Sequence, residues 1–182
     1  MCGIVGYINL NGNKPDISID ELSAALYHRG PDGLGSYYGS YFALGHRRLS
    51  IIDISDLGRQ PMEYMNRYLI VFNGEIYNYL ELKTLLSDVG YEFRNHTDTE
   101  VIMAAYDFWG PACLNRFNGM WAFLIYDLTK DNFFISRDRF GIKPLYYYKD
   151  DNHFIFSSEI KALVTHPVVE IIPNIKFLKN YL

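Results

Sequence analysis

The sequence predicts an α+β fold with antiparallel sheets. Strand patterns outnumber helix patterns and do not alternate regularly with them, which argues against a doubly wound parallel sheet. Tyr (16) and Phe (12) are abundant, as suits wide sheets packed against other layers. The chain of 182 residues lies in the usual size range of one domain and is long enough for a substantial core. We therefore expect one domain over residues 1–182.

The first half of the chain contains several strand patterns and one helix pattern. The runs that predict strands are residues 3–8, 37–44, 47–52 and 68–72. Ser18 and Glu21 have the spacing of a capping box, and the helix that follows has an apolar face of Ile19, Leu22 and Leu26. The glycine-rich segment 30–35 matches neither the Walker nor the dinucleotide-binding pattern, so it predicts a loop.

The second half begins with two helix patterns. Asn78 can cap the first, which Gly90 closes and whose apolar face is Leu82, Leu85, Leu86 and Val89. Thr97 and Glu100 form a second capping box, before a helix with Val101, Ala104, Ala105 and Phe108 on one side. Strands are then expected over 120–126, 133–136, 145–148 and 154–156, and a short helix over 159–164. The tail of about 167–182 is apolar without a clear closing element, as expected of a segment that leads toward a further domain.

Composition excludes several classes of function. Seventeen basic and 21 acidic residues give a net charge of −4, which provides no broad basic surface for nucleic acid. No apolar run approaches the roughly 18 residues of a membrane span, and the N-terminus has no signal-peptide pattern. The five histidines lack metal-ligand spacing, so we expect no metal site. Two cysteines do not suggest a disulfide framework, and a reducing cytoplasm is the expected location.

Cys2 is the sharpest chemical feature, although a cysteine at position 2 usually has no catalytic role. Removal of Met1, which is common before a small residue, would leave a thiol and a free α-amine on the same residue. An α-amine titrates near pH 8, so at neutral pH it can take the thiol proton. The resulting thiolate can attack a carboxamide carbon.

Asn73 and Gly74 are candidates for the donors that such an attack requires. A side-chain amide and an unhindered backbone N–H side by side could stabilise the developing oxyanion. The alternative is a type I′ hairpin turn, which Asn-Gly favours strongly. The segment runs on toward a helix pattern at Asn78, whereas a hairpin needs a second strand. Both interpretations remain open from the residues alone.

Two charged residues are candidates for holding an amino-acid substrate. Arg48 lies at the edge of an apolar strand and suits bidentate capture of an α-carboxylate, although a solvated strand-edge arginine is commoner. Asp98 could hold an α-ammonium, or it could only complement the dipole of the helix that it begins. The basic segment 137–144 is interleaved with Asp, Gly and Pro, which indicates an ordered turn and not a phosphate-binding patch.

These segments together resemble a known family. The segments that carry the resemblance are Met1-Cys2-Gly3-Ile4-Val5-Gly6, His28-Arg29-Gly30-Pro31-Asp32, Arg48-Leu49-Ser50-Ile51, Asn73-Gly74-Glu75-Ile76-Tyr77-Asn78, Thr97-Asp98-Thr99-Glu100 and Arg137-Asp138-Arg139-Phe140-Gly141. In this order they are similar to the glutaminase domain of glutamine-hydrolysing asparagine synthetases, within the class II glutamine amidotransferases. The resemblance covers residues 2 to about 165.

The resemblance implies an N-terminal-nucleophile hydrolase fold, a four-layer αββα sandwich. It implies that Cys2 is the nucleophile and that Asn73 and Gly74 form the oxyanion hole. Arg48, the backbone of Leu49, Ser50, Ile51 and Ile52, Glu75 and Asp98 would then bind glutamine together with the oxyanion donors. The reaction implied is hydrolysis of glutamine to glutamate and ammonia through a glutamyl thioester, which needs no cofactor.

One departure from the family is large. Its members continue into a C-terminal synthetase domain that uses ATP and Mg to make asparagine from aspartate, and nothing in these 182 residues resembles the Ser-Gly-Gly-x-Asp loop of that domain. The expected partners are glutamine and such a domain, in cis or as a separate subunit; a homodimer is also open. Two alternatives remain: a glutaminase half that serves another carboxylate, such as a sugar or antibiotic precursor, and a non-catalytic regulatory domain.

Overall fold

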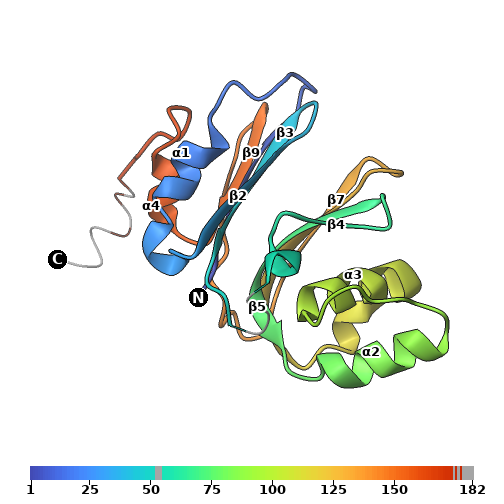
Figure 1. Cartoon of the computed structure of the whole chain (residues 1–182). Helices are drawn as coiled ribbons and strands as arrows, with labels where there is room; N and C mark the ends of the chain where they lie inside the picture. The colour runs from blue at the N-terminus through green and yellow to red at the C-terminus, as the bar shows by residue number, and fades with distance from the viewer. Residues whose placement is uncertain (52–54, 174, 176, 178–182) are drawn as a thin grey trace.

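Two antiparallel sheets form the centre of the computed structural model, which describes residues 1–51, 55–173, 175 and 177 (Figure 1). The first sheet has the strand order β2-β3-β1-β9-β8. Its strands are β1 (Gly3–Asn9), β2 (Gly33–Tyr38), β3 (Phe42–Arg48), β8 (Tyr146–Lys149) and β9 (His153–Ser157). The second sheet has the order β4-β5-β6-β7. Its strands are β4 (Met62–Tyr64), β5 (Tyr68–Ile76), β6 (Gly119–Asp127) and β7 (Asn132–Arg137).

Helices cover the outer face of each sheet. α1 (Ile19–Ala24) and α4 (Ile160–Val164) lie on the first sheet, and α2 (Tyr79–Asp88) and α3 (Asp98–Trp109) lie on the second (Figure 1). Short 3₁₀ segments are η1 (Tyr27–Arg29), η2 (Asp56–Gly58) and η3 (Gly110–Asn115). The layers are therefore helix, sheet, sheet, helix, and the predicted α+β fold with two antiparallel sheets is confirmed.

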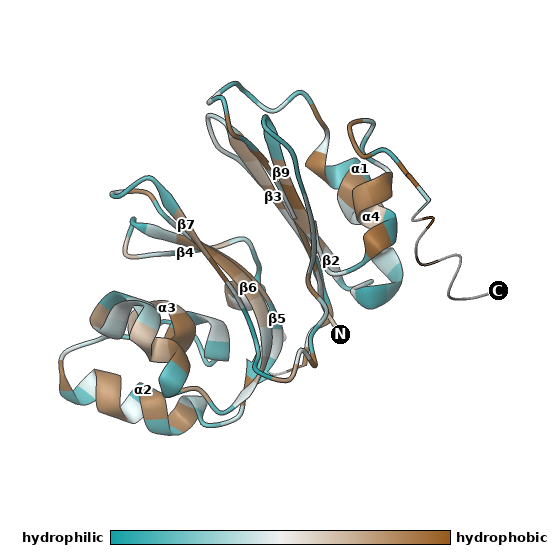
Figure 2. Cartoon of the chain, turned by 180° about the vertical axis from the view of Figure 1, so that it is seen from behind, coloured by the Kyte–Doolittle hydropathy of each residue, from teal (hydrophilic) through white to brown (hydrophobic). Residues whose placement is uncertain are grey.

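Three apolar clusters hold the layers together. The middle cluster lies between the sheets and includes Ile4, Val71 and Leu124. Each of the other two clusters joins one sheet to the helices that cover it. Figure 2 shows the apolar strands of both sheets in brown. Burial of these faces is the main stabilising contribution to such a fold. The N-terminus lies at the end where the sheets converge (Figure 1).

The predictions for residues 30–52 need correction. Residues 37–44 are not one strand: β2 ends at Tyr38, and a turn follows in which the Gly39 N–H donates to the Phe42 carbonyl at 2.8 Å. Half of the predicted loop at 30–35 belongs to β2, an edge strand of alternating exposure. Gly39 and Ser40 interrupt the aromatic and apolar run and are a favoured pair for a hairpin turn, so the sequence did contain a signal for two strands that the prediction overlooked. The strand expected over 47–52 ends at Arg48, and position 52 lies outside the described residues.

The helix predictions are confirmed in position and corrected in detail. Thr97 caps α3 by accepting the Glu100 N–H, as the capping box predicts. Asn78 stands at the N-cap of α2 but makes no capping hydrogen bond, because its side chain joins the segment before β6, through the Arg116 carbonyl and the Asn118 N–H. The predicted apolar faces are also narrower than expected, since Leu85, Val89 and Phe108 are about half exposed. β4 was not predicted.

Candidate active site

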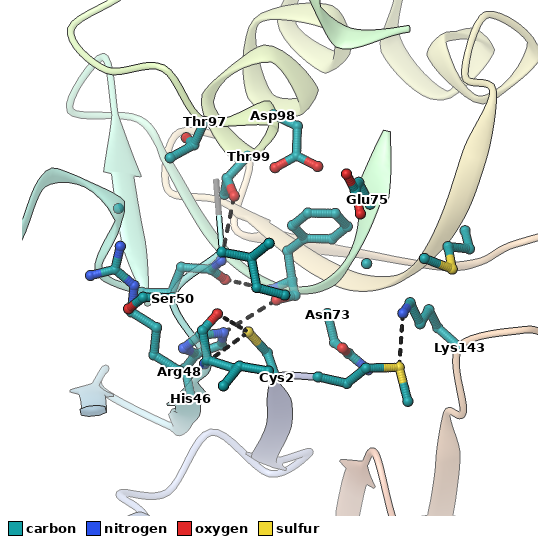
Figure 3. Close-up of a pocket in the computed structure, with 18 of the residues that line it drawn as sticks. Cys2, His46, Arg48, Ser50, Asn73, Glu75, Thr97, Asp98, Thr99 and Lys143 are labelled. Carbon is teal, nitrogen blue, oxygen red and sulfur yellow. Dashed lines mark hydrogen bonds between the residues drawn. The ribbon is translucent and has the colours of Figure 1, made fainter. Parts of the chain in front are cut away.

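A cavity of about 330 Å³ opens at the end of the sandwich where the N-terminus lies. Every predicted site residue that the structure describes lines it (Figure 3). These residues are Cys2, Arg48, Leu49, Ser50, Ile51, Asn73, Gly74, Glu75 and Asp98. They come from the start of β1, the end of β3, the end of β5 and the start of α3. Ile52 is outside the described residues.

The Cys2 thiol is held against the segment that follows β3. The Leu49 N–H donates to its Sγ at 3.4 Å, and Sγ lies 3.6 Å from the Leu49 carbonyl. Burial raises the pKa of the Cys2 thiol, while the Leu49 N–H and the positive charges of the N-terminus, Arg48 and Lys143 act in the opposite direction. With Met1 still attached, the thiol is therefore not activated. A base must take its proton before it can attack.

The segment 28–32 binds both the backbone of Cys2 and the loop after β3 that contacts the Cys2 thiol. Arg29 donates from Nε to the Cys2 carbonyl at 3.0 Å and is itself paired with Glu159 at 2.9 Å. Asp32 accepts the Ser50 N–H at 2.8 Å. Gly30 between them has no room for a side chain, because a Cβ would lie 2.4 Å from the Arg47 carbonyl. This segment therefore fixes the nucleophile and the loop beside it relative to each other.

Asn73 lies within β5 and presents an unused donor. The residue is 1% exposed, and its Nδ2 has no hydrogen-bond partner among the described residues. An unsatisfied buried amide costs on the order of 1–3 kcal/mol, so native proteins rarely retain one without a reason. Asn73 and Gly74 pair with Ala122 and Trp121 of β6 inside a continuous ladder, which excludes the hairpin-turn alternative.

The Gly74 N–H points away from β6. The N–H groups of Phe72 and Ile76, two residues to either side, are bound by side chains and not by β6. Trp121, which lies opposite Gly74, has its own N–H and carbonyl paired with Asp138. Because alternate residues of a strand direct their N–H groups to the same edge, the Gly74 N–H faces the open edge of β5, where Gly74 lines the cavity.

Asp98 is buried at the first turn of α3, and its Oδ2 accepts the Ile76 N–H at 2.9 Å. The pKa of Asp98 is raised to about 6, first by burial and also by the nearby Glu75 carboxylate, while backbone N–H groups oppose both. A buried carboxylate with a raised pKa gains most from a cationic ligand. The Glu75 side chain is half-buried at the end of β5 and borders the same cavity.

Arg48 lies at the mouth of the cavity, where its Nη1 donates to the Ser55 carbonyl at 2.8 Å. The contact orients the guanidinium along the segment that follows β3. Ile51 lines the cavity as well, but it is 67% exposed.

His46, Gln60 and Lys143 are polar residues of the site that were not predicted from the sequence. His46 reaches the Phe72 carbonyl at 3.2 Å and so connects the two sheets. Gln60 accepts the Phe72 N–H at 2.6 Å and donates to Thr99 at 3.4 Å. Lys143 brings a buried amine into the cavity. Their contacts span 12 to 142 residues of sequence, so no local pattern could have indicated them.

The basic segment 137–144 is an ordered turn, as predicted. The Asp138 carboxylate accepts the N–H groups of Phe140, Ile142 and Lys143, in addition to that of Trp121. Arg137 donates to the Gly141 and Lys143 carbonyls. These bonds hold Lys143 at the cavity.

The described residues show no sign of a metal site or of a membrane-spanning helix. No group of three His, Cys, Asp or Glu side chains in those residues is placed to hold a metal ion. No helix in the same part of the chain has the length and apolar character to cross a bilayer.

Comparison with solved structures identifies the fold. The glutamine phosphoribosylpyrophosphate amidotransferase of Bacillus subtilis superposes with a TM-score of 0.72 at 21% identity, over 90% of this chain and 43% of that one. The chain therefore has the N-terminal-nucleophile hydrolase fold that the resemblance implied.

Comparison of sequences identifies the family: the chain belongs to the glutamine amidotransferase domain family, which matches residues 1–182. A protein of Methanocaldococcus jannaschii is 44% identical over 183 residues, covering 90% of this chain and 35% of that protein. Asparagine synthetase 3 of Bacillus subtilis is 36% identical, covering 93% of this chain and 28% of its own length. Asparagine synthetase B of Escherichia coli is 39% identical, covering 90% of this chain and 30% of its own length. The chain thus spans about a third of the length of these relatives.

Proposed function

We propose that this domain hydrolyses glutamine to glutamate and ammonia, with Cys2 as the nucleophile after removal of Met1. One observation carries the proposal: the Asn73 Nδ2, which has no acceptor among the described residues, and the Gly74 N–H, which faces the open edge of β5, border the same cavity as the Cys2 thiol. A thiol beside two unused donors is the arrangement that acyl transfer from an amide requires.

The chemistry follows from this arrangement. The free α-amine of Cys2 takes the thiol proton, and the thiolate attacks the side-chain carbonyl carbon of glutamine. The oxyanion of the tetrahedral intermediate is bound by Asn73 and Gly74. Collapse of the intermediate releases ammonia, which leaves with the proton from the α-ammonium. Water activated by the same amine then hydrolyses the thioester to glutamate and restores the thiol.

The cavity also has groups for the amino-acid end of glutamine. Asp98 offers a buried carboxylate to the α-ammonium, with Glu75 beside it. Arg48 offers a guanidinium to the α-carboxylate. Opposite charges at the same mouth select a zwitterionic substrate over a simple amide, which favours glutamine over other carboxamides.

The test is glutamate release from glutamine by the Met-processed chain, measured for wild type, Cys2→Ala and Cys113→Ala. Cys113 is the matched control, because it is a buried thiol in η3 that does not line the cavity. We expect Cys2→Ala to abolish turnover and Cys113→Ala to retain it, with both variants folded by circular dichroism. Turnover by Cys2→Ala would overturn the proposed nucleophile.

We further propose that the ammonia serves ATP-dependent asparagine synthesis from aspartate in a longer protein. The proposal is supported by the relatives named as asparagine synthetases, which are about three times as long as this chain. ATP and Mg would be bound by the additional part, in cis or as a separate subunit. Residues from about 167 would lead toward it, and their exposed apolar side chains, including Ile171 and Ile172, offer contacts.

Asparagine formation from glutamine, aspartate and ATP by the longer protein tests this second proposal. We expect Cys2→Ala to abolish the reaction with glutamine but not with added ammonia. Amidation of a different carboxylate in the same assay would contradict asparagine as the product and retain the glutaminase.

A further inference from the structure

The amine of Lys143 lies in the same cavity as Cys2 and has no role in the reaction proposed above. The residue is 4% exposed and lines the cavity with Cys2. Among the described residues, its Nζ has one hydrogen-bonding neighbour, the Met1 Sδ at 2.9 Å (Figure 3). A thioether is a weak acceptor, so this contact compensates poorly for burial of an ammonium.

The contact to Met1 is also temporary under the proposed function, on which this inference rests. Removal of Met1 takes the sulfur away and leaves the α-amine of Cys2 in place of a peptide nitrogen. The backbone of Lys143 is fixed at the edge of the cavity, because its N–H donates to Asp138 at 2.9 Å and its carbonyl accepts from Arg137 at 2.8 Å. Processing therefore brings a second basic nitrogen to a site that already holds one.

The other charges around Lys143 do not remove its effect. Arg29 adds positive charge, and its own acidic partner is Glu159. Asp138 is negative, but four backbone N–H groups already occupy its carboxylate. Glu75 faces the cavity as well, and its charge favours the ammonium form of Lys143. On the side of Cys2, Arg48 is a further cation.

We propose that the Lys143 ammonium drives the first proton off the thiol and α-amine of processed Cys2, so that the reactive form is present at neutral pH. The pair carries two protons and one positive charge at low pH. Loss of one proton leaves either thiol with neutral amine or thiolate with ammonium, and each has one positive charge fewer. A neighbouring cation favours that loss in both cases, so the effect belongs to the pair and not to one atom.

Lys143 is thus a positioning charge and not a base. The intrinsic pKa of an α-amine is about 8 and that of a lysine about 10.4, so the amine of Cys2 loses its proton first when both share a site. The pKa of Lys143 is lowered, first by burial and then by Arg29, while the charges of Cys2, Glu75 and Asp138 oppose this shift and favour the ammonium form that the proposal requires.

The experiment measures the rate at which iodoacetamide alkylates Cys2 between pH 5 and 10 in Met-processed protein. Wild type is compared with Lys143→Met, Lys143→Gln and Lys143→Arg. Cys113 serves as an internal control of the fold, because it is fully buried and burial raises its pKa to about 12. A folded variant leaves Cys113 unlabelled.

We expect the midpoint of Cys2 alkylation to rise by about one pH unit in the two neutral variants, which lowers the rate at pH 7 roughly tenfold, and to stay near wild type in Lys143→Arg. An unchanged midpoint in a folded neutral variant would overturn the role of Lys143. The alkylation assay needs no glutamine, so this failure is distinct from absence of wild-type glutaminase activity, which would count against the proposed function instead.

Discussion

At the scale of single residues, Asp98 combines two tasks that pull in different directions. Its carboxylate anchors the end of β5 through the Ile76 N–H, and it faces the cavity as a buried charge. Burial raises the pKa of Asp98 to about 6, so near neutral pH the side chain is a carboxylate whose charge is less favourable in the folded chain than in water. Such a group is stabilised when an α-ammonium binds.

Asp98→Asn should raise the KM for glutamine roughly 10- to 100-fold with a smaller change in kcat, because it removes charge that binds the ground state. In wild type, kcat/KM should fall as the pH drops below about 6, where Asp98 becomes protonated. Asp98→Asn should lose this dependence. The measurement is the pH profile of kcat/KM for both proteins, and a pure kcat effect would contradict a binding role.

Although Asp98→Asn should bind glutamine less tightly, it should unfold less easily than wild type near neutral pH. The pKa of Asp98 is higher in the folded chain than in the unfolded chain, so its contribution is complete below pH 4 and is lost as the pH rises through about 6. Asp98→Asn should therefore be more stable than wild type at pH 7, by up to about 2 kcal/mol, and not at pH 4. Urea unfolding at both pH values checks this, and equal differences at the two would count against the raised pKa.

Asn73 also combines a cost to stability with a proposed role in the reaction, in this case in the transition state. Its Nδ2 is buried without a partner, so it costs stability until an oxyanion arrives. Asn73→Ala should lower kcat by about 10²–10³ with little change in KM, because the donor acts on developing charge. Its unfolding free energy should stay within about 1 kcal/mol of wild type, since the change removes an unsatisfied group along with some packing. A large rise in KM alone would assign Asn73 to substrate binding.

At the scale of elements, β5 is the strand that joins structure to chemistry. Its first residues pair with β4 on one edge and with β6 on the other. β4 stops opposite Ile70, so the rest of that edge is left for the side chains of Gln60 and Asp98 and for the Gly74 N–H. The site exists because one strand is longer than its neighbour.

Gly74→Ala tests how closely β5 and β6 must approach. A Cβ at this position would lie 2.3 Å from the Met120 carbonyl and 2.6 Å from the Phe72 ring, so β5 must shift. We expect a loss of a few kcal/mol in unfolding free energy and loss of glutaminase activity. Gly33→Ala is the matched control, because its Cβ would have ordinary contact with Arg48 at 3.6 Å. Similar stability of the two variants would show that the strand accommodates the side chain.

At the scale of the whole molecule, His46 connects the two sheets beneath the cavity. Its Nε2 lies 3.2 Å from the Phe72 carbonyl, an acceptor, so the Nε2–H tautomer is required and Nδ1 keeps its lone pair. Burial lowers the pKa of His46 to about 4, and the ring is therefore neutral at physiological pH. Protonation would place a charge between the layers.

This burial predicts an acid-sensitive sandwich. The folded pKa of His46 lies below the unfolded value of 6.5, so its contribution is present above pH 6.5 and is lost as the pH falls toward 4. Between those values wild type should lose about 3 kcal/mol more unfolding free energy than His46→Gln, whose amide can still donate to the Phe72 carbonyl. Urea unfolding of both proteins from pH 7 to 4 checks the difference. Parallel curves would show that His46 is not the group responsible.

Much of this organisation could be predicted from spacing along the chain. Capping boxes, strand periodicity and turn residues depend on neighbours within a few positions, so α1, α3 and the four strands of the second half were placed well. Cys2, Asn73 and Asp98 could be named as candidates from their residue types, but each had a structural alternative that the residues alone left open. Their roles were implied only by the resemblance, and the structure places all three on one cavity.

Only the tertiary structure decided which side chains of distant segments contact each other. The Asn78 side chain bonds to residues 38 and 40 positions away instead of capping α2, and the Lys143 Nζ contacts Met1, which is 142 positions away. Hydrogen bonds and charges act through a few ångströms of space, and local periodicity carries no information about which remote side chain will occupy that space.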